Sequence, residues 1–389
     1  MKKRVLHIIT RLDPGGSTTN TLETVARLDT SKYEAHLVAG ATADPSGKAA
    51  AFMRDRGIAC TFVDELVREV DPGPDIKAFF ALRSIIQKGA YDIVHTHSSK
   101  AGILGRWAAK SVGVKHIVHT PHGHVFYGYF SPLKTKVFIT IERLTAYVTD
   151  RLVALTAAGV REHLEFKVGR EKQWVTIPSG INLAEFKENA SARMRIRREF
   201  GFQDHECVII CVARLEPVKG LGTLIEAVGI LRSEGVHVRL LLAGGGGEEM
   251  ALKALVFEKG LMDRVVFAGH RDDASDILNG ADIFALASRN EGMGRAVIEA
   301  MACGKPVVVS RTGGLPEIVT DGVEGFCVEP GDALAFANAL GMVVKDTALR
   351  GRMSEAAQRR ATGEFSVETM VRKIECLYDG LIQGLPEGL

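Results

Sequence analysis

The chain has 389 residues, of which 46% are hydrophobic and 25% are charged, and its formal net charge is +2. At roughly 150 residues per domain this length predicts two or three domains, and the composition excludes wholesale disorder. The small net charge argues against a strong nucleic-acid-binding field, so no nucleic-acid partner is expected.

The first segment, Met1-Lys2-Lys3-Arg4, superficially resembles the start of a signal peptide. The apolar run after it, 5–9, is short and is interrupted by His7, so we predict a strand instead. No run of about 18 apolar residues exists that would predict a spanning helix. The cysteines contain no C-x-x-C pair and are interpreted as reduced thiols. We therefore expect a cytoplasmic protein that touches a membrane, if at all, from its inner face.

Short apolar runs alternate with longer helical patterns along the first half of the chain. β-Branched runs separated by helices are typical of parallel sheets buried on both faces. The predicted strands are 5–9, 34–39, 59–63, 93–96, 115–120 and 152–155, and the predicted helices are 18–28, 49–56 and 76–88.

The same pattern restarts after the turn-rich segment 177–182 and a basic helix at 192–200. The predicted strands are now 207–212, 238–243, 265–267, 283–286, 306–310 and 325–328, with a helix at 222–234. We place the boundary near residue 185. The predicted fold class is α/β, with two doubly wound Rossmann-like domains, 1–185 and 186–366, facing a ligand crevice at the carboxyl ends of their strands.

Two cations follow the strand 207–212 on a loop at its carboxyl end. Arg214 offers a planar fork and Lys219 a point charge, and both suit phosphate oxygens. The helix that begins after Gly220 adds partial positive charge at its N-terminus. The alternative interpretation is a solvated basic loop.

Two carboxylates flank a glycine-containing loop after the strand 283–286. Gly292 and Gly294 would let backbone N–H groups approach an anion at the start of the next helix, which carries Glu299. Carboxylates beside phosphates are costly unless they bind hydroxyls or cations, so Glu291 and Glu299 indicate recognition of a polyol. Alternatively, each is an ordinary surface glutamate at one end of a helix.

The ordered set of motifs resembles the retaining glycosyltransferases of family 4, which have the GT-B fold. It consists of Ala213-Arg214-Leu215-x3-Lys219-Gly220, the E-x7-E pair at 291 and 299, and the segment 312–332. The resemblance implies transfer of a hexosyl unit, with retention, from a nucleotide-diphosphate sugar to an acceptor hydroxyl. UDP is the nucleotide that the family favours. The resemblance also implies that 1–185 is the acceptor-side domain, that 186–366 binds the donor, and that a last helix at 367–381 packs back on the first domain.

The family implies a role for each matching residue of the donor domain. Glu299 would hold the ribose hydroxyls, Arg214 and Lys219 would neutralise the diphosphate, and Glu291 would bind the donor sugar. Backbone amides complete the site, those of His270 and Arg271 at the base and those of Gly292, Met293, Gly294 and Arg295 at the sugar and phosphates.

The first domain would supply the opposite wall. The backbone N–H of Gly16, in the loop 13–17, would contact the leaving phosphate, although the family's usual glutamate after this loop is replaced here by residues 17–20. His122 resembles the active-site histidine near the reacting carbon. His97, Ser98 and Lys100 fall in a segment found in members that build bacterial surface polysaccharides, where they would contact the acceptor or the donor sugar. A helix N-cap at Ser98 or its neighbour is an equal alternative.

Histidines cluster between 95 and 124, but they lack accompanying carboxylate or cysteine ligands, and several fall in predicted strands. The chain also has no D-x-D pair to carry a divalent ion, so neither a metal nor another cofactor is expected. The segment 124–151 mixes aromatic and basic residues and would rest on anionic lipid beside a lipid-linked or saccharide acceptor. A packed helix pair is the alternative.

Two other functions remain open, a nucleotide-sugar 2-epimerase of the same architecture and a non-catalytic nucleotide-binding scaffold. The sequence names neither the sugar, the base, the acceptor nor the oligomeric state.

Overall fold

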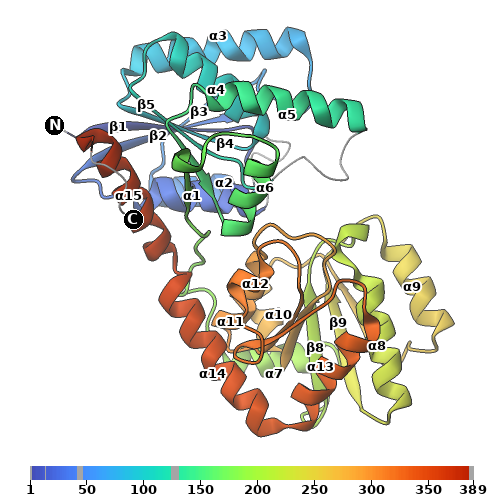
Figure 1. Cartoon of the computed structure of the whole chain (residues 1–389). Helices are drawn as coiled ribbons and strands as arrows, with labels where there is room; N and C mark the ends of the chain where they lie inside the picture. Colours follow the sequence, from blue (N-terminus) through green and yellow to red (C-terminus); the bar gives the residue numbers. More distant parts are fainter. Residues whose placement is uncertain (1, 14, 42–46, 124–130, 385–389) are drawn as a thin grey trace. The chain divides into compact units, whose positions relative to one another are not determined.

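The computed structural model describes residues 2–13, 15–41, 47–123 and 131–384 (Figure 1). The chain forms two compact units. The first comprises Met1–Gly180 together with Val367–Leu389, and the second comprises Ile181–Ser366. The chain thus passes to the second unit after Gly180 and returns to the first with its last helix.

In its described residues the first unit holds a seven-stranded parallel sheet in the order β3-β2-β1-β4-β5-β6-β7. Its strands are β1 (Lys3–Ile9), β2 (Tyr33–Gly40), β3 (Cys60–Val63), β4 (Ile93–His97), β5 (His116–Thr120), β6 (Arg151–Ala154) and β7 (Trp174–Thr176). Its helices are α1 (Gly16–Arg27), α2 (Lys48–Arg56), α3 (Pro72–Gly89), α4 (Ser99–Ser111), α5 (Pro132–Ala146), α6 (Ala157–Glu165) and α15 (Val367–Gln383).

The period-two alternation of the strands decides what each face of this sheet contacts. Leu6 and Ile8 of β1 belong to the core beneath α3 and α4, whereas Val5 belongs to the core that contains α15. Figure 1 shows α3 and α4 on one face and α1 and α2 on the other. Both faces are covered, so the central strands β1, β4 and β5 are buried almost throughout, and their buried positions include polar residues, chiefly histidine and threonine.

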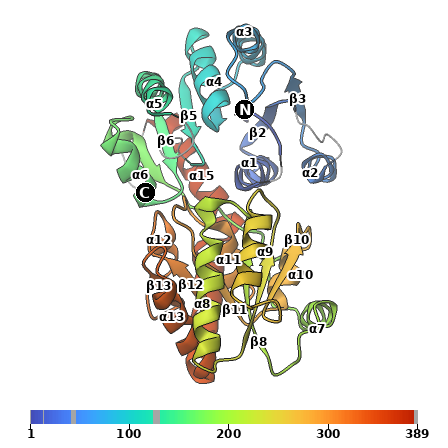
Figure 2. The same cartoon turned by 90° about the vertical axis from the view of Figure 1, so that its right-hand side faces the viewer.

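The second unit holds, among the residues described, a six-stranded parallel sheet in the order β10-β9-β8-β11-β12-β13 (Figure 2). Its strands are β8 (Cys207–Val212), β9 (Val238–Ala243), β10 (Val265–Gly269), β11 (Ile283–Leu286), β12 (Val307–Ser310) and β13 (Gly325–Val328). Its helices are α7 (Ala190–Glu199), α8 (Leu221–Ser233), α9 (Glu249–Glu258), α10 (Ala274–Asn279), α11 (Arg295–Ala302), α12 (Leu315–Ile318), α13 (Ala333–Lys345) and α14 (Thr347–Glu364). Helix α8 packs against α13, and α11 packs against α14.

Each sheet reverses its strand order at one place, between β1 and β4 in the first unit and between β8 and β11 in the second. The loops that leave the carboxyl ends of these paired strands diverge to opposite faces, and this is where open α/β sheets bind ligands. Gly16, the segment 97–100, Arg214, Lys219 and Glu291 all follow one of these four strands, whereas His122, His270 and the segment 312–332 follow β5, β10 and β12.

Every strand predicted from the sequence is present, with its ends shifted by at most two residues. The short strand β7 was not predicted as a separate element. Helix α3 begins four residues before the predicted start, because Asp71 caps it by accepting from the N–H of Gly73 at 3.1 Å. The six cysteines, all among the described residues, are free thiols. No helix in the described segments is long and apolar enough to cross a membrane.

Candidate functional site

In the second unit, the site residues stand on the loops that follow β8 and β11. The loop after β8 contains a 3-10 turn, Pro217–Lys219, and enters α8 through Gly220. The loop after β11 runs to Gly294 at the start of α11. The two loops are joined directly, because the N–H of Arg289 donates to the carbonyl of Val218 at 2.8 Å.

Lys219 and Glu291 form the central ion pair of this site. The Lys219 Nζ lies 2.6 Å from the Glu291 Oε2, and the two side chains are only 17% and 15% exposed. The Ser288 hydroxyl donates to the same carboxylate oxygen at 3.1 Å. Within this half-buried site, the ammonium of Lys219 can bind a phosphate, and the carboxylate of Glu291 can accept hydrogen bonds from sugar hydroxyls.

Gly313 lets the segment after β12 approach the backbone of Glu291 closely. Gly313 has φ +51°, and a Cβ on it would lie 1.9 Å from the carbonyl oxygen of Glu291. The N–H of Gly314 donates to that carbonyl at 3.1 Å. Any side chain at 313 would therefore displace the loop that carries the carboxylate, which explains the glycine at this position.

Glu299 lies on α11 one turn beyond Arg295, as predicted, and the two side chains pair at 3.3 Å. The Glu299 side chain is 14% exposed. Burial raises the pKa of its carboxyl, and the positive charge of Arg295 acts in the opposite direction. On the loop that precedes α11, Met293 is buried and Gly292 is exposed. The surface of the loop at Gly292 therefore consists of backbone atoms.

Arg214 differs from Lys219 in exposure. Its guanidinium pairs with Glu216 at 2.6 Å, and its side chain is 68% exposed. The cation predicted for the diphosphate therefore stands on the surface of the loop after β8, where a ligand would have to draw it away from Glu216.

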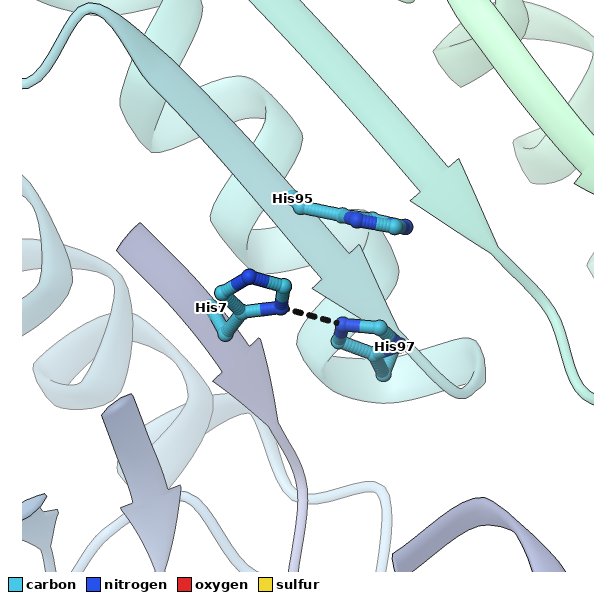
Figure 3. Close-up of side chains that lie close together, drawn as sticks. All are labelled: His7, His95 and His97. Atoms are coloured by element: carbon cyan, nitrogen blue, oxygen red, sulfur yellow. Dashed lines mark hydrogen bonds between the residues drawn. The ribbon is translucent and has the colours of Figure 1, made fainter. Parts of the chain in front are cut away.

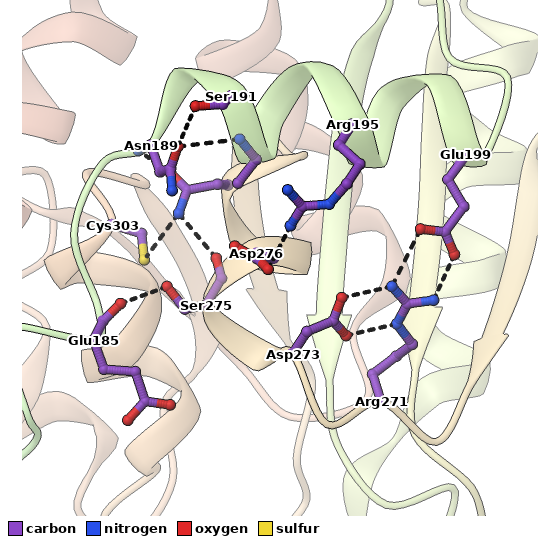
Figure 4. Close-up of polar contacts among 12 residues, drawn as sticks. Glu185, Asn189, Ser191, Arg195, Glu199, Arg271, Asp273, Ser275, Asp276 and Cys303 are labelled. Carbon is purple, nitrogen blue, oxygen red and sulfur yellow. Dashed lines mark hydrogen bonds and ion pairs between the residues drawn. The ribbon is translucent and has the colours of Figure 1, made fainter.

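The loop after β10 is held by an ion triad. Figure 4 shows the Arg271 guanidinium between Asp273 and Glu199, with nitrogen–oxygen distances to Asp273 of 2.8 and 2.6 Å. The hydrogen bond from Arg271 lowers the pKa of Asp273, and both carboxylates raise that of Arg271. The His270 side chain is 75% exposed. Through this triad the Arg271 side chain anchors the loop to α7. The arrangement is consistent with the prediction that backbone groups of this loop, rather than side chains, contact the base.

A hollow lies beside this triad, between the segment 184–189 and the start of α10 (Figure 4). Its polar groups bond one another: the Ser275 hydroxyl donates to the Glu185 carbonyl at 2.6 Å, and Asn189 caps α7. None of the side chains predicted to contact a donor lines this hollow. We therefore assign no ligand to it.

In the first unit, Gly16 is the first residue of α1. The first turn of a helix leaves its N–H groups without intrahelical partners, so the Gly16 amide is suited to an anion. Pro14, in the same predicted loop, lies outside the described residues. Ser98 stands at the N-cap position of α4 but makes no side-chain cap bond, and the Lys100 ammonium contacts Asp75 and the carbonyl of Glu69.

Buried histidines line the α15 face of this sheet. His7 on β1 and His95 on β4 are register partners, and His97 follows two residues along β4 on the same face (Figure 3). The His7 Nδ1 and His97 Nε2 lie 3.0 Å apart. His95 Nδ1 lies 2.6 Å from the Tyr378 hydroxyl of α15. We call His7, His95, His97 and Tyr378 the imidazole array.

The array reaches His122. The His97 Nδ1 lies 2.9 Å from the His122 Nε2, and the two rings are stacked. His122 has φ +59°, a conformation that a non-glycine residue adopts only where its surroundings hold it, at a cost of about 1–3 kcal/mol. His119, as predicted for a packed strand residue, lies on β5 facing away from the array, bonded to Thr96. His124 lies outside the described residues.

His7, His95 and His97 form a cluster whose nearest ring nitrogens all lie within 4.8 Å of one another, close enough to raise the question of a metal site. Their geometry indicates hydrogen bonding instead. His95 and His97 stack with centroids 4.3 Å apart, and His7 stacks on His97, so the rings do not converge on one point. Burial lowers the pKa of all three, that of His7 to about 3, which keeps them neutral.

Sequence reasoning missed His7 and Tyr378 as members of this site. His7 was noted only as an interruption of an apolar run, and Tyr378 lies 371 residues from it along the chain. The available signal was the position of His7 at the carboxyl half of the first strand, on the same alternating face as Val5 and Ile9.

Two family models match almost consecutive parts of the chain. The model described as Glycosyltransferase Family 4 matches residues 14–185, and that described as Glycosyl transferases group 1 matches residues 192–360. The chain is 31% identical over 331 residues to the UDP-Gal:α-D-GlcNAc-diphosphoundecaprenol α-1,3-galactosyltransferase of Escherichia coli, covering 84% of this chain and 85% of that protein. It is 28% identical over 312 residues to the N-acetyl-α-D-glucosaminyl L-malate synthase of Bacillus anthracis, covering 79% of each.

Solved structures show the same fold. The crystal structure of HepE from Anabaena in complex with UDP matches with a TM-score of 0.83 at 24% sequence identity, over 98% of this chain and 100% of that one. HepE has also been crystallised with UDP-glucose.

Proposed function

The chain belongs to glycosyltransferase family 4 and is a glycosyltransferase with the GT-B fold that uses a nucleotide sugar, and we propose that its donor is a UDP-sugar. We further propose that it transfers a hexosyl unit, with retention, to an acceptor hydroxyl in the synthesis of a bacterial surface polysaccharide or lipid-linked glycan. The observation that carries the proposal is the Lys219–Glu291 pair on the switch-point loops.

The chemistry proposed for this pair follows from its charges. As the bond to the sugar breaks, negative charge grows on the diphosphate, and Lys219 and Arg214 would stabilise it. When Lys219 turns to the phosphate, Glu291 is released to accept hydrogen bonds from the sugar hydroxyls. Glu299, on α11, would accept from the ribose diol. No step needs a metal, since protein cations and helix N-termini supply the positive charge.

For retention, we propose that the acceptor hydroxyl attacks on the face from which the diphosphate departs. The departing phosphate oxygen takes the acceptor proton, the new bond forms to the anomeric carbon, and the bond to the diphosphate breaks. The anomeric configuration of the product, read by NMR, tests this proposal, because an inverted centre would refute it.

The nucleotide is tested by a thermal-shift panel of UDP, GDP and ADP with their sugar conjugates. We expect UDP and one UDP-sugar to raise the melting temperature, because a ligand at 100 times its Kd stabilises the native state by about 2.7 kcal/mol. GDP and ADP at equal concentration are the matched controls. A rise with GDP or ADP and none with UDP would overturn the assignment of the base.

Two rival functions are separated by simple incubations. A 2-epimerase would convert the donor into another nucleotide sugar with no acceptor present. A non-catalytic scaffold would bind the nucleotide yet release none from any donor. Family membership and the Lys219–Glu291 pair favour the transferase over both.

Helix α5 offers a surface for an anionic membrane, and we propose that the enzyme docks there near a lipid-linked acceptor. Leu133, Val137, Leu144 and Tyr147 form an exposed stripe at helical spacing, the first and last each 74% exposed. Lys134 and Lys136, also exposed, lie beside it. Residues 124–130 of the predicted segment lie outside the described residues.

Replacing Lys134 and Lys136 together by glutamine is expected to weaken binding to phosphatidylglycerol-containing vesicles about thirtyfold, since each lysine near an anionic surface contributes about 1 kcal/mol. Vesicle co-sedimentation measures this. Lys253→Gln/Lys259→Gln, on and beside α9, is the matched control. Equal binding by both double variants, or no preference for anionic over neutral vesicles, would refute docking through α5.

A further inference from the structure

The imidazole array ends at the predicted active-site histidine, His122. We propose that His7, His95, His97 and Tyr378 are positioning residues that fix one tautomer of His122, with the proton on Nε2 and a bare, accepting Nδ1. What Nδ1 accepts from rests on the proposed function, whereas the tautomer itself does not.

The directions of the hydrogen bonds in the array depend on one another, because each imidazole ring is neutral. Burial excludes the charged form of His7, His95 and His97, whose pKa values all lie far below the usual range. A neutral imidazole has one N–H donor and one bare acceptor nitrogen. Once one bond in the chain has a direction, every bond linked to it must follow.

The Tyr378 hydroxyl sets that direction. Its oxygen lies 2.6 Å from the His95 Nδ1 and 3.5 Å from the His7 Nε2. We assign the single hydroxyl proton to the shorter contact, because 2.6 Å is an ordinary length for an O–H donor. The contact with His7 is longer than the usual N–H bond, but the His7 Nε2 faces the hydroxyl oxygen. An N–H at that position is favoured over two facing lone pairs, so we place the His7 proton on Nε2.

The remaining assignments follow in order. With its proton on Nε2, His7 accepts at Nδ1 from the Nε2–H of His97 over 3.0 Å. His97 in turn accepts at Nδ1 from the Nε2–H of His122 over 2.9 Å. At the far end, the His95 Nε2–H donates to the Thr120 hydroxyl at 2.8 Å. One pattern of protons satisfies these four hydrogen bonds and the longer contact between Tyr378 and His7.

This pattern has a chemical consequence at His122. In the reverse pattern the Nδ1 of His122 would carry a proton and would donate to a carbonyl or phosphate oxygen. In the pattern inferred here Nδ1 accepts, which suits a sugar hydroxyl. The last helix, α15, thus helps to select what His122 binds, because it supplies Tyr378.

The test reads the tautomer directly, in the full-length enzyme labelled with ¹⁵N-histidine and free of substrate. Long-range ¹H–¹⁵N NMR distinguishes a protonated from a bare ring nitrogen, and the signals lost in His122→Gln identify His122. We expect a protonated Nε2 and a bare Nδ1. In Tyr378→Phe we expect averaged signals of both tautomers and a fall in kcat/KM of about tenfold, corresponding to one hydrogen bond of about 1.4 kcal/mol.

Tyr33→Phe is the matched control. The Tyr33 ring packs on Tyr378 with centroids 5.9 Å apart, and its hydroxyl contacts Asp379 rather than the array. It should leave the His122 signals and kcat/KM unchanged. A proton on Nδ1 of His122 in the wild type, or unchanged His122 signals in Tyr378→Phe, would overturn the proposal. So would a stoichiometric transition metal bound by His7, His95 and His97. A wild type with the inferred tautomer that transfers no sugar would instead refute the proposed function.

Discussion

Replacing Lys219 by alanine is expected to lower kcat by about 100- to 1,000-fold, the usual loss when one group that stabilises developing negative charge is removed. The expectation follows from its place: the Nζ lies 2.6 Å from Glu291 in a half-buried site, on the loop that leaves β8 at the switch point. The measurement is steady-state transfer from the donor that the thermal-shift panel identifies. Far-UV circular dichroism should show an unchanged fold.

Lys253→Ala is the matched control for this variant. Lys253 also pairs with a glutamate at 2.6 Å, but the two side chains are 50% and 37% exposed and belong to α9. Its removal should cost at most about 0.5 kcal/mol of stability and no turnover.

The Lys219→Ala variant leaves Glu291 without its counter-charge, so a loss of stability of about 1–3 kcal/mol is also expected. Adding Glu291→Gln should recover that stability but not the activity. Near-normal turnover by Lys219→Ala would refute the site.

Replacing Glu299 by alanine is expected to weaken binding of the donor about 100-fold. Each hydrogen bond between a ribose hydroxyl and a charged carboxylate contributes about 1.5–3 kcal/mol, and the Glu299 side chain is only 14% exposed. Titration calorimetry with the nucleotide and with its 2′-deoxy analogue measures this contact. The wild type should prefer the ribonucleotide, and Glu299→Ala should lose most of that preference.

The preference, rather than the affinity alone, makes this test specific. Glu299→Ala also breaks the ion pair with Arg295, which could disturb α11 without any contact to ribose. A structural disturbance would weaken both nucleotides equally and leave the preference intact, and that result would contradict the assignment. Glu355→Ala on α14, which also breaks a glutamate–arginine pair at helical spacing, should change neither value.

The local pattern of apolar and polar residues was sufficient to predict most of the strands. Apolar β-branched runs such as Cys207–Val212 and Ile283–Leu286 became central strands, because only a strand covered on both faces tolerates such a run. The pattern was too weak where an element is short and half-buried, as in Trp174–Thr176. Helix α14 was not predicted, although its N-cap residue gave a usable signal. Asp346 caps the helix by accepting from the N–H of Leu349 at 2.9 Å.

The candidate site was predicted residue by residue but not as a set of contacts. Spacing and loop chemistry identified the two residues separately, Lys219 as a predicted ligand of the diphosphate and Glu291 as a predicted ligand of the sugar. That they bind each other depends on β8 and β11 being neighbours, although β9 and β10 lie between them in the sequence. Likewise, composition could not distinguish the exposed guanidinium of Arg214 from that of Arg271, which is held between two carboxylates.

By itself, the sequence determined the α/β class, the two repeated halves and the family, because these depend on periodicity and on short motifs. The tertiary structure alone decided which of the motif residues form ion pairs and which histidines lie within hydrogen-bonding distance of one another. The imidazole array is the clearest case. Its members come from β1, β4 and the last helix, and only the packing of α15 brings the Tyr378 hydroxyl to His95. Hydrogen bonds depend on distances of a few tenths of an ångström between segments far apart in the chain, and no local pattern encodes them.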